Sequence, residues 1–444
     1  MFRGTAVACF ITAALGAASA EARQADVILV GARVLTADPA RPTAEAVAVV
    51  GERIQRVGST EEIQRLRGAK TRVVDLRGRT VIPGLIDAHV HLLPASQIVD
   101  EPSLRRYEEA SLPKVMTGFI SHGITTVRST GDPIPYITQL RDRMEQATTG
   151  PRLVVTGSLI SAPGGHPATT ICRNNPFCRN AGVLEVATED QARRAVQGLA
   201  RAQVNAVKIV VDDVIVKVPA LSDQIIAAVV DESDRNGLRV VAHVSVAADV
   251  PATKRLIELG VDEFAHPPTE RLEGADAKET IDLLARLKRP VTTTLAPFDA
   301  YKDANGEERT LMGGRPFTSG MRTQFDHLLG VVRHYADAGV KLVVGTDWFD
   351  RPIKLDDPRL QPGAYTLQEM DVLHRAGLST PAILAAATRH AAEALQIVDQ
   401  LGTISEGKLA DLVILEGDLL QDFSALHRTA AVFKSGRLAH GSLP

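Results

Sequence analysis

The stretch Val81-Ile82-Pro83-Gly84-Leu85-Ile86-Asp87-Ala88-His89-Val90-His91 decides how the rest of the chain is interpreted. Side chains alternate along a β-strand, so His89 and His91 point to the same side. Two imidazoles placed where a strand leaves its sheet can bind one metal ion. Alone, a His-x-His pattern is a weak signal and also suits two packing histidines. The remaining sequence has to decide between these interpretations.

The composition is that of an ordinary folded protein. The chain has 444 residues, of which 45% are apolar and 23% are charged, and this excludes disorder, collagen and coiled coil. Fifty Lys and Arg oppose 53 Asp and Glu, for a net charge of -3, and no run of like charge stands out. A nucleic-acid partner is therefore not expected, because its phosphates require a basic surface. We expect a small-molecule substrate instead.

The middle of the chain, residues 83–397, alternates apolar strands with amphipathic helical patterns. This alternation predicts an α/β fold with βα units around a parallel sheet. Eight units in this length fit a (β/α)8 TIM barrel. The competing fold, an open doubly wound sheet, usually shows a Gly-rich phosphate loop after its first strand, and none is visible. The predicted strands are Gly84–His91, Gly123–Ser129, Arg152–Ser158, Ala206–Val211, Leu238–Ser245, Glu263–Pro267, Pro290–Pro297 and Lys341–Asp347.

The two ends of the mature chain share a different pattern. Short apolar runs separated by glycines occur in residues 21–82 and again in residues 398–444. This texture predicts one small β-sandwich domain that is built from both termini and flanks the barrel.

Residues 1–20 resemble a cleavable signal peptide. Arg3 precedes an apolar stretch of small residues, and Ala18-Ser19-Ala20 matches the A-x-A cleavage rule. We expect cleavage after Ala20 and a periplasmic or secreted protein; the alternative is a buried N-terminal helix. The apolar run is too short to span a bilayer, so no membrane span is expected in the mature chain.

Cysteine usage agrees with export. Without the leader, the chain keeps only Cys172 and Cys178, which flank a proline turn. In an exported chain, two cysteines this close predict a disulfide. Two free thiols or weak metal ligands are the alternatives.

Polar residues recur near the ends of the predicted barrel strands. Lys208 lies in the fourth strand, His243 in the fifth, His266 in the sixth, and Asp347 ends the eighth. Barrel enzymes build their sites at the C-terminal ends of their strands. Each residue is embedded in apolar sequence, so its buried polar group needs a partner, which a metal cluster would supply. An ordinary strand-end lysine and core histidines remain the alternatives.

Together these motifs resemble the amidohydrolase superfamily of metal-dependent hydrolases in its two-metal form. The resemblance rests on the first stretch, on Gly123-Ile-Thr-Thr-Val-Arg128, on the polar strand ends and on residues 402–415. It extends over essentially the whole mature chain. The branch it resembles most is related to imidazolonepropionase and includes exported dipeptidases.

The resemblance implies a ligand set of six residues for two divalent ions. His89 and His91 would bind the more buried ion together with Asp347, and His243 and His266 would bind the second. Lys208 would bridge both ions as a carbamate, formed from its neutral amine and CO2. Zinc suits such a site, although manganese, iron or cobalt could also occupy it.

The activity implied is hydrolysis of a carbon–nitrogen amide bond in an N-acyl amino acid, a dipeptide or a cyclic amide. A metal-bridging hydroxide would attack the carbonyl, and Asp347 would act as general base and then as general acid. The alternatives are a lactonase or organophosphate esterase on the same site, a mononuclear deaminase, and a catalytically silent binding protein. A homo-oligomer is also possible.

Two further residues are candidates for substrate binding. His166 lies in a Gly-Gly-His segment similar to one common in this branch, and it would contact the substrate or pack within its loop. Arg128 could face the site or form a structural ion pair. The long loops 159–189, 298–322 and 348–365 are expected to carry specificity. Val244-Ser245 and Pro267-Pro268 depart from the peptidase pattern and put dipeptide specificity in doubt.

Overall fold

The computed structural model describes residues 24–94, 97–212, 217–303, 305–310, 316–349 and 360–444. The predicted signal peptide, residues 1–20, lies outside the described residues. Parts of the loops 298–322 and 348–365 also lie outside them.

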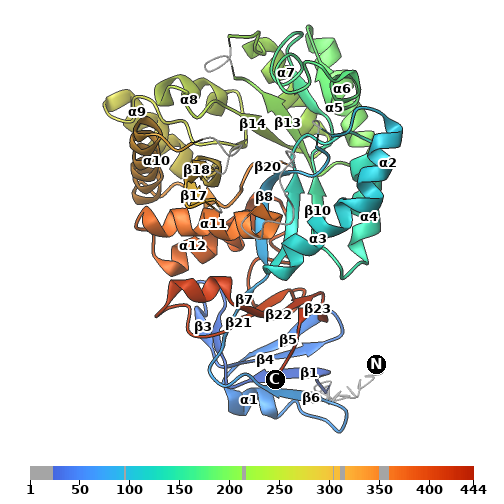
Figure 1. Ribbon diagram of the computed structural model, residues 1–444, viewed down its shortest axis with the longest axis vertical. Coiled ribbons are helices and arrows are strands. Elements are labelled where there is room, and N and C mark those ends of the chain that lie inside the picture. Colours follow the sequence, from blue (N-terminus) through green and yellow to red (C-terminus); the bar gives the residue numbers. More distant parts are fainter. Residues whose placement is uncertain (1–23, 95–96, 213–216, 304, 311–315, 350–359) are drawn as a thin grey trace, which may run out of the picture.

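Strands from both ends of the chain share one sheet. In the six-stranded order β23-β22-β21-β7-β2-β3, β7 pairs with β21 from the C-terminal segment and with β2 from the N-terminal segment. Blue and red strands accordingly lie together at the lower end of the molecule in Figure 1. A second sheet has the order β5-β4-β1-β6. The strands are β1 Val27–Val30, β2 Arg33–Leu35, β3 Thr43–Ala44, β4 Ala46–Val50, β5 Arg53–Gly58, β6 Arg72–Asp75, β7 Thr80–Pro83, β21 Leu412–Leu415, β22 Thr429–Lys434 and β23 Arg437–Gly441.

These two sheets contribute to one hydrophobic cluster. Leu29 and Val47 come from the sheet that contains β1, while Val81, Leu412 and Phe433 come from the sheet that contains β7. All five side chains are buried. Burial of apolar surface between the sheets therefore joins the two chain ends, as the shared texture predicts.

Each of the eight predicted barrel strands contains a parallel strand. They belong to two sheets, with the orders β10-β9-β8-β20 and β12-β11-β13-β14-β15-β16-β19. The strands are β8 Leu85–His91, β9 Ile124–Ser129, β10 Arg152–Val155, β11 Leu159–Ser161, β12 Val183–Glu185, β13 Ala206–Val210, β14 Arg239–His243, β15 Glu263–Phe264, β16 Val291–Thr292, β19 Leu342–Val343 and β20 Trp348–Phe349. A separate hairpin pairs β17 Ala300–Lys302 with β18 Glu308–Thr310.

Backbone hydrogen bonds connect the two parallel sheets at both seams. Ala88 N–H in β8 donates to the carbonyl of Val344, which follows β19, at 2.9 Å. Asn205 N–H, just before β13, donates to the carbonyl of Val155 in β10 at 2.8 Å. The seam beside β8 places His89 next to Asp347, whose N–H donates to the His89 carbonyl at 2.8 Å.

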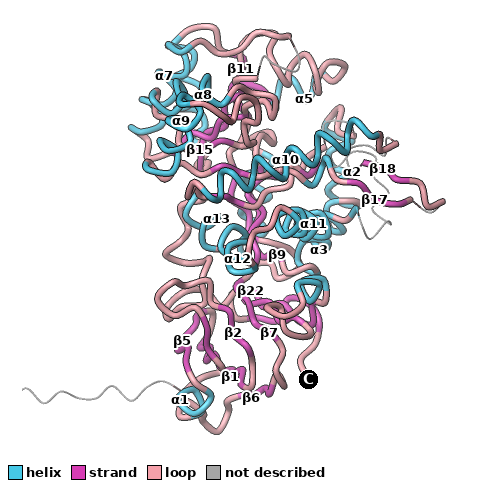
Figure 2. The backbone as a smooth tube through the Cα atoms, turned by 90° about the vertical axis from the view of Figure 1, so that its left-hand side faces the viewer, coloured by secondary structure: helices cyan, strands magenta, loops and turns pink. Residues whose placement is uncertain are grey.

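Helices surround the parallel strands in both views (Figures 1 and 2). Their apolar faces pack on the strands, and side chains cap the first turn of some of them, as Thr188 caps α6 and Ser222 caps α7. The helices are α1 Thr60–Gln64, α2 Glu101–Ala110, α3 Leu112–Ser121, α4 Tyr136–Glu145, α5 Pro176–Gly182, α6 Glu189–Arg201, α7 Asp223–Arg235, α8 Val250–Glu258, α9 Ala275–Arg286, α10 Ser319–Asp337, α11 Pro362–Arg375, α12 Thr380–Ala387 and α13 Arg389–Ala394.

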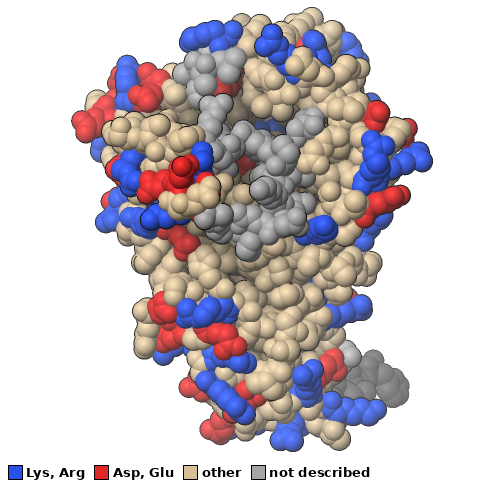
Figure 3. All heavy atoms as spheres, in the orientation of Figure 1, with Lys and Arg blue, Asp and Glu red and all other residues tan. Residues whose placement is uncertain are grey.

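The predicted disulfide is confirmed. Cys172 and Cys178 are bonded, with their Cα atoms 5.4 Å apart. No helix in the described part of the chain combines the length and the apolar character needed to cross a membrane. Positive and negative side chains are interspersed over the face shown in Figure 3.

Lys434 fastens the C-terminal segment to the parallel-strand region. Its buried ammonium, at the end of β22, donates to the carbonyls of Met144, Ala147 and Gly150 at 2.9, 2.7 and 3.1 Å. Lys434→Met should lower the free energy of unfolding by about 3 kcal/mol, because three carbonyls lose a charged donor. Urea unfolding measures this loss. Lys278→Met, at a largely exposed lysine, should change stability little, and an equal loss in both variants would contradict the assignment.

Candidate metal centre

The six predicted metal ligands meet in one cavity. His89 and His91 end β8, Lys208 lies in β13, His243 ends β14, His266 follows β15 and Asp347 follows β19. All six line a cavity of about 350 Å³. The carboxyl ends of neighbouring parallel strands therefore bring together residues that are far apart in the sequence.

Asp347 lies between the two histidines of β8. Its Oδ1 is 3.3 Å from Nε2 of His89 and 3.2 Å from Nε2 of His91. The His89 side chain is 1% exposed, whereas those of His91 and Asp347 are 29% and 24% exposed. The buried histidine thus lies beneath a carboxylate that remains open to the cavity.

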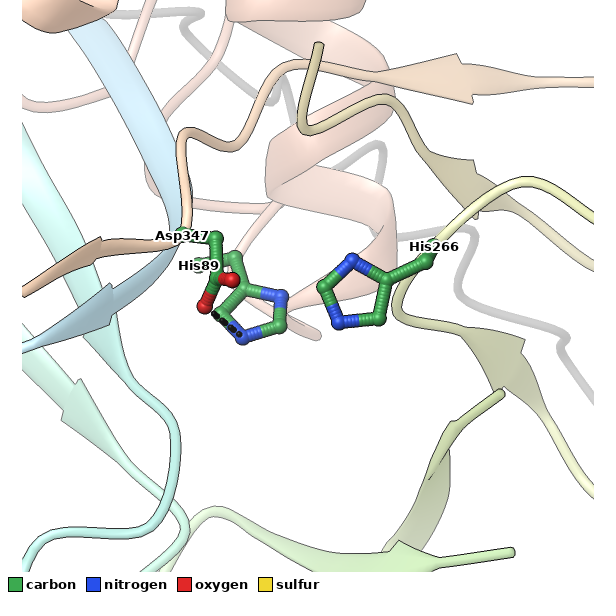
Figure 4. A group of neighbouring side chains, drawn as sticks. All are labelled: His89, His266 and Asp347. Carbon is green, nitrogen blue, oxygen red and sulfur yellow. Dashed lines mark ion pairs between the residues drawn. The ribbon is translucent and has the colours of Figure 1, made fainter. Parts of the chain in front are cut away.

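His266 approaches this group from the opposite side. Ligand atoms of His89, His266 and Asp347 lie within 4.8 Å of one another, and Figure 4 shows the two rings and the carboxylate converging. The family resemblance divides these residues differently, with His91 beside His89 and His266 at the second ion. In the structure the ring centroids of His89 and His266 lie 5.0 Å apart.

Hydrogen-bond partners orient the histidine rings. Nε2 of His266 lies 3.0 Å from Nδ1 of His243, and Nδ1 of His266 lies 2.8 Å from Oγ1 of Thr294. Nδ1 of His89 lies 3.2 Å from the carbonyl oxygen of Ala265. This carbonyl favours a proton on Nδ1 and leaves Nε2 of His89 free to bind a metal.

Lys208 has a buried amine without a hydrogen-bond partner in the described chain. Its side chain is 2% exposed. Burial lowers its pKa to about 7, although the Asp347 charge opposes this shift, and the Arg128 charge lowers the pKa further. A large fraction of the amine is therefore neutral near neutral pH.

The surrounding groups also have the protonation states that bind metals. Burial holds the pKa values of His89 and His266 well below the usual range, and the charges of Lys208 and His243, respectively, add to this effect. For Asp347, burial raises the pKa, but the hydrogen bond from His91 and the neighbouring imidazoles of His266 and His243 lower it overall. Neutral imidazoles and an ionised carboxylate are the forms that ligate divalent ions.

The Asp87 carboxylate fixes the backbone of the segments that carry the candidate metal ligands. Its carboxylate is fully buried and accepts hydrogen bonds from His89 N, Thr346 N, Thr346 Oγ1 and Thr366 Oγ1 at 2.8–3.1 Å. The two Thr346 bonds link β8 to the segment that carries Asp347, and the Thr366 bond links β8 to α11. The backbone of Asp347 has a φ of 52°, a left-handed conformation that costs energy in a residue with a side chain. The Asp87 contacts help to hold that conformation.

Arg128 is engaged in a buried ion pair. Both terminal nitrogens donate to the Glu263 carboxylate, with Nη1 2.8 Å from Oε2, and Nε donates to the carbonyl of Ala88 at 2.8 Å. The two side chains are 1% and 2% exposed, and neither residue lines the cavity. Of the two alternatives left open by the sequence, this geometry corresponds to the ion pair rather than to a substrate contact.

His166 lies in the wall of the cavity. Its ring stacks on that of His243 with centroids 5.1 Å apart, and its Nδ1 lies 2.7 Å from Oγ1 of Thr170. Burial lowers the pKa of His166 to about 4, so the imidazole is neutral. The predicted contact with substrate stays a prediction, and the ring is placed where such a contact is possible.

Three residues of the site escaped the sequence analysis. Asp212 lines the cavity, with Oδ2 3.5 Å from Nε2 of His243, and Asp132 lines it while accepting hydrogen bonds from Leu92 N and Leu93 N at 2.8 and 2.9 Å. Thr294 contacts His266. Asp212 and Asp132 follow strands that were predicted, so their position at a strand end was a usable signal. Thr294 lies within a predicted strand, and the sequence contains no signal that marks it as a site residue.

A sequence profile of the amidohydrolase family matches residues 80–439, which is most of the chain. The chain belongs to the amidohydrolase family. It is therefore a metal-dependent hydrolase that acts on carbon–nitrogen bonds, and the His89–His266–Asp347 group is a possible place for its metal.

The relatives of this amidohydrolase differ in how much they share with it. Imidazolonepropionase of Brevibacillus brevis is 23% identical over 84% of this chain and 83% of its own length. A prolidase whose crystal structure contains N-methylphosphonate-L-proline has a TM-score of 0.74 and 25% identity over 94% of this chain and all of its own. N-substituted formamide deformylase of Arthrobacter pascens is 36% identical, but the match spans only 17% of its length and 20% of this chain.

The buried amine of Lys208 makes the stability of the metal-free protein depend on pH. Between about pH 7 and its ordinary pKa of 10.5, the folded state holds fewer protons at this amine than the unfolded chain does. Stability should therefore rise with pH through this interval. Urea unfolding in CO2-free buffer at pH 7 and pH 9 should show this rise, and Lys208→Met should lack that part of it. An unchanged pH difference in the variant would show that Lys208 does not carry the shift.

Proposed function

We propose that this amidohydrolase is an exported, dinuclear-metal enzyme that cleaves an amide bond in a small molecule. The observation that carries the proposal is the Lys208 amine, which is buried without a hydrogen-bond partner in the described chain and lines the same cavity as four histidines and Asp347. An ammonium without a partner is costly to bury. Reaction of the neutral amine with CO2 would replace the cation by a carbamate that can bind metals.

The donor set fits two zinc ions. His89, His91 and Asp347 would hold one ion, His243 and His266 would hold the other, and carbamylated Lys208 would join both. Imidazole and carboxylate donors suit zinc. The pairing of His89 with His266 in the structure also allows one ion to bind between them, and the number of ions is therefore the property to measure first.

The chain's own residues supply positioning and proton transfer. When bound, the ions would polarise the scissile carbonyl and lower the pKa of a water molecule to near neutrality. Asp347, ionised and open to the cavity, would accept the proton of the attacking water and return it to the departing nitrogen. His166, neutral and in the cavity wall, would contact the substrate near the scissile bond. The prolidase and the deformylase among the relatives support an amide rather than an ester bond.

The proposal also includes a fold and a cellular compartment for the protein. We infer that the two parallel sheets, hydrogen-bonded at both seams, close into a (β/α)8 barrel spanning residues 83–397. Residues 21–82 and 398–444 would form the β-sandwich domain, which the shared cluster of Leu29, Val81 and Leu412 supports. The confirmed disulfide supports export and removal of residues 1–20, because disulfides persist in oxidising compartments.

Metal content tests the number of ions. Mature protein reconstituted with zinc and bicarbonate should bind close to two zinc ions per chain, measured by atomic emission. Lys208→Ala should bind one ion or fewer, because the bridging ligand is lost. One ion in both proteins would replace the dinuclear site by a mononuclear one and favour a deaminase.

Asp347→Asn tests proton transfer. An amide keeps the shape of the side chain but cannot accept the proton, so kcat should fall at least about 100-fold while most of the bound metal remains. The effect is measured as hydrolysis of N-acyl amino acids and dipeptides, monitored by the release of free amine. Asp337→Asn, at an aspartate that is 66% exposed in α10, provides the matched control. Retention of more than a tenth of the wild-type activity would remove Asp347 from this role.

A further inference from the structure

One wall of the cavity is apolar. Its lining includes Leu93, Leu159, Cys172, Phe177, Val183 and Val210. Among the described lining residues there is no arginine, and Lys208 is the sole lysine. A carboxylate on the substrate would therefore find no cationic partner along this described wall, whereas an apolar group would lose its contact with water.

The apolar wall begins beside the metal-binding residues. Val210 lies two residues after Lys208 in β13, so both side chains point to the same side of the strand. On the other side, a Cβ atom added to Gly131 would lie 2.9 Å from Cδ2 of Leu159 and 3.7 Å from Cε1 of His91. Leu159 and His91 are thus close neighbours around Gly131. A group attached near a scissile bond at the metal centre would contact this wall.

The disulfide holds the wall in place. Cys172 is 3% exposed and packs with Leu159, Ala168, Val183 and Val210, and Cys178 packs against the same cluster. The segment between the cysteines is also bound to the rest of the cavity wall, because Asn175 Nδ2 donates to the carbonyl of Ile98 at 2.7 Å. Because the wall is ordered before binding, the binding free energy is not reduced by the entropic cost of ordering this loop.

The rim of this wall exposes apolar side chains. Ile171 lines the cavity and is 55% exposed, and Val99, next to the lining residue Ile98, is 53% exposed. Large exposed apolar side chains that continue into a cavity are typical of binding sites rather than of ordinary surface.

We propose that the disulfide-closed segment 166–183 forms an apolar specificity subsite, and that the substrate is an amide carrying a bulky aromatic or aliphatic group next to the scissile bond. This inference rests on the proposed function and names its substrate class. The part of the substrate in this subsite carries no charge.

Matched substrates test the preference. The zinc-loaded mature protein is assayed with N-acetyl-, N-hexanoyl- and N-phenylacetyl-L-alanine, and with N-acetyl-L-phenylalanine, so that the apolar group is presented on either side of the amide. At least one bulky compound should have a kcat/KM about ten-fold or more above that of N-acetyl-L-alanine. Hydrolysis of all four compounds at equal efficiency would overturn the subsite while leaving the proposed function intact.

Ile171→Ser tests the wall itself. Because Ile171 is half exposed, this substitution should leave the fold intact and reduce the preference for the bulky compound several-fold, mainly through KM. Leu287→Ser, at a leucine that is 47% exposed and does not line the cavity, is the matched control and should not change the preference. An unchanged preference in Ile171→Ser, or an equal loss in both variants, would contradict the assignment.

A binding measurement distinguishes a failure of the proposed subsite from a failure of the proposed amide hydrolysis. Calorimetric titration of Asp347→Asn with the same four compounds reports affinity without turnover, and the bulky compounds should bind about ten-fold more tightly. If the wild-type protein hydrolyses none of the four compounds but this order of affinities is retained, the proposed amide hydrolysis is overturned and the subsite is supported. Equal affinities would overturn the subsite.

The double variant Cys172→Ser/Cys178→Ser tests the role of the disulfide. Opening the loop should lower the ratio of kcat/KM for the bulky compound to kcat/KM for N-acetyl-L-alanine several-fold, mainly through a higher KM for the bulky compound. Reduction of the wild-type protein by a phosphine should produce the same change, and it should not affect the double variant. Retention of the full preference in the double variant would show that the disulfide does not hold the subsite.

Discussion

The burial of the Lys208 amine among histidines is the constraint on which the rest of the site depends. A buried ammonium needs an acceptor, and the described chain supplies none. Burial instead favours the neutral amine. The same burial keeps His89 and His266 neutral, while Asp347 stays ionised beside His91. The site is therefore a set of neutral nitrogen donors around one ionised carboxylate, the forms in which these groups bind a cation, which agrees with a metal-dependent family.

The fold holds these donors with a second layer of buried polar contacts. Asp87 joins β8 to the segment before β20 through Thr346 and to α11 through Thr366. Across the strands, the ion pair of Arg128 and Glu263 connects β9 to β15. Because β15 and β19 are only two residues long, these side-chain contacts help to fix the positions of strands that few backbone hydrogen bonds hold.

In the proposed function, substrate selection lies on different elements from catalysis. The donors come from strand ends, whereas the proposed apolar wall comes largely from the long segment after β11, which α5, the disulfide and Asn175 hold against the strands. Such a division lets the loop vary while the ligands stay in place. The family match reaches across most of the chain, while the relatives carry the names of different activities.

The sequence by itself determined the strand pattern and the identity of the candidate donors. Alternation along β8 places His89 and His91 on one side, and the apolar runs around Lys208, His243 and Asp347 mark them as buried strand ends. Two nearby cysteines predicted their disulfide correctly. Tertiary structure alone decided that Arg128 meets Glu263, that Asp212 reaches His243, that His89 meets His266, and that Cys172 packs with Val210 beside Lys208. These pairs lie on separate elements, so their distances follow from how the strands are arranged around the cavity, which periodicity and spacing along one chain do not specify.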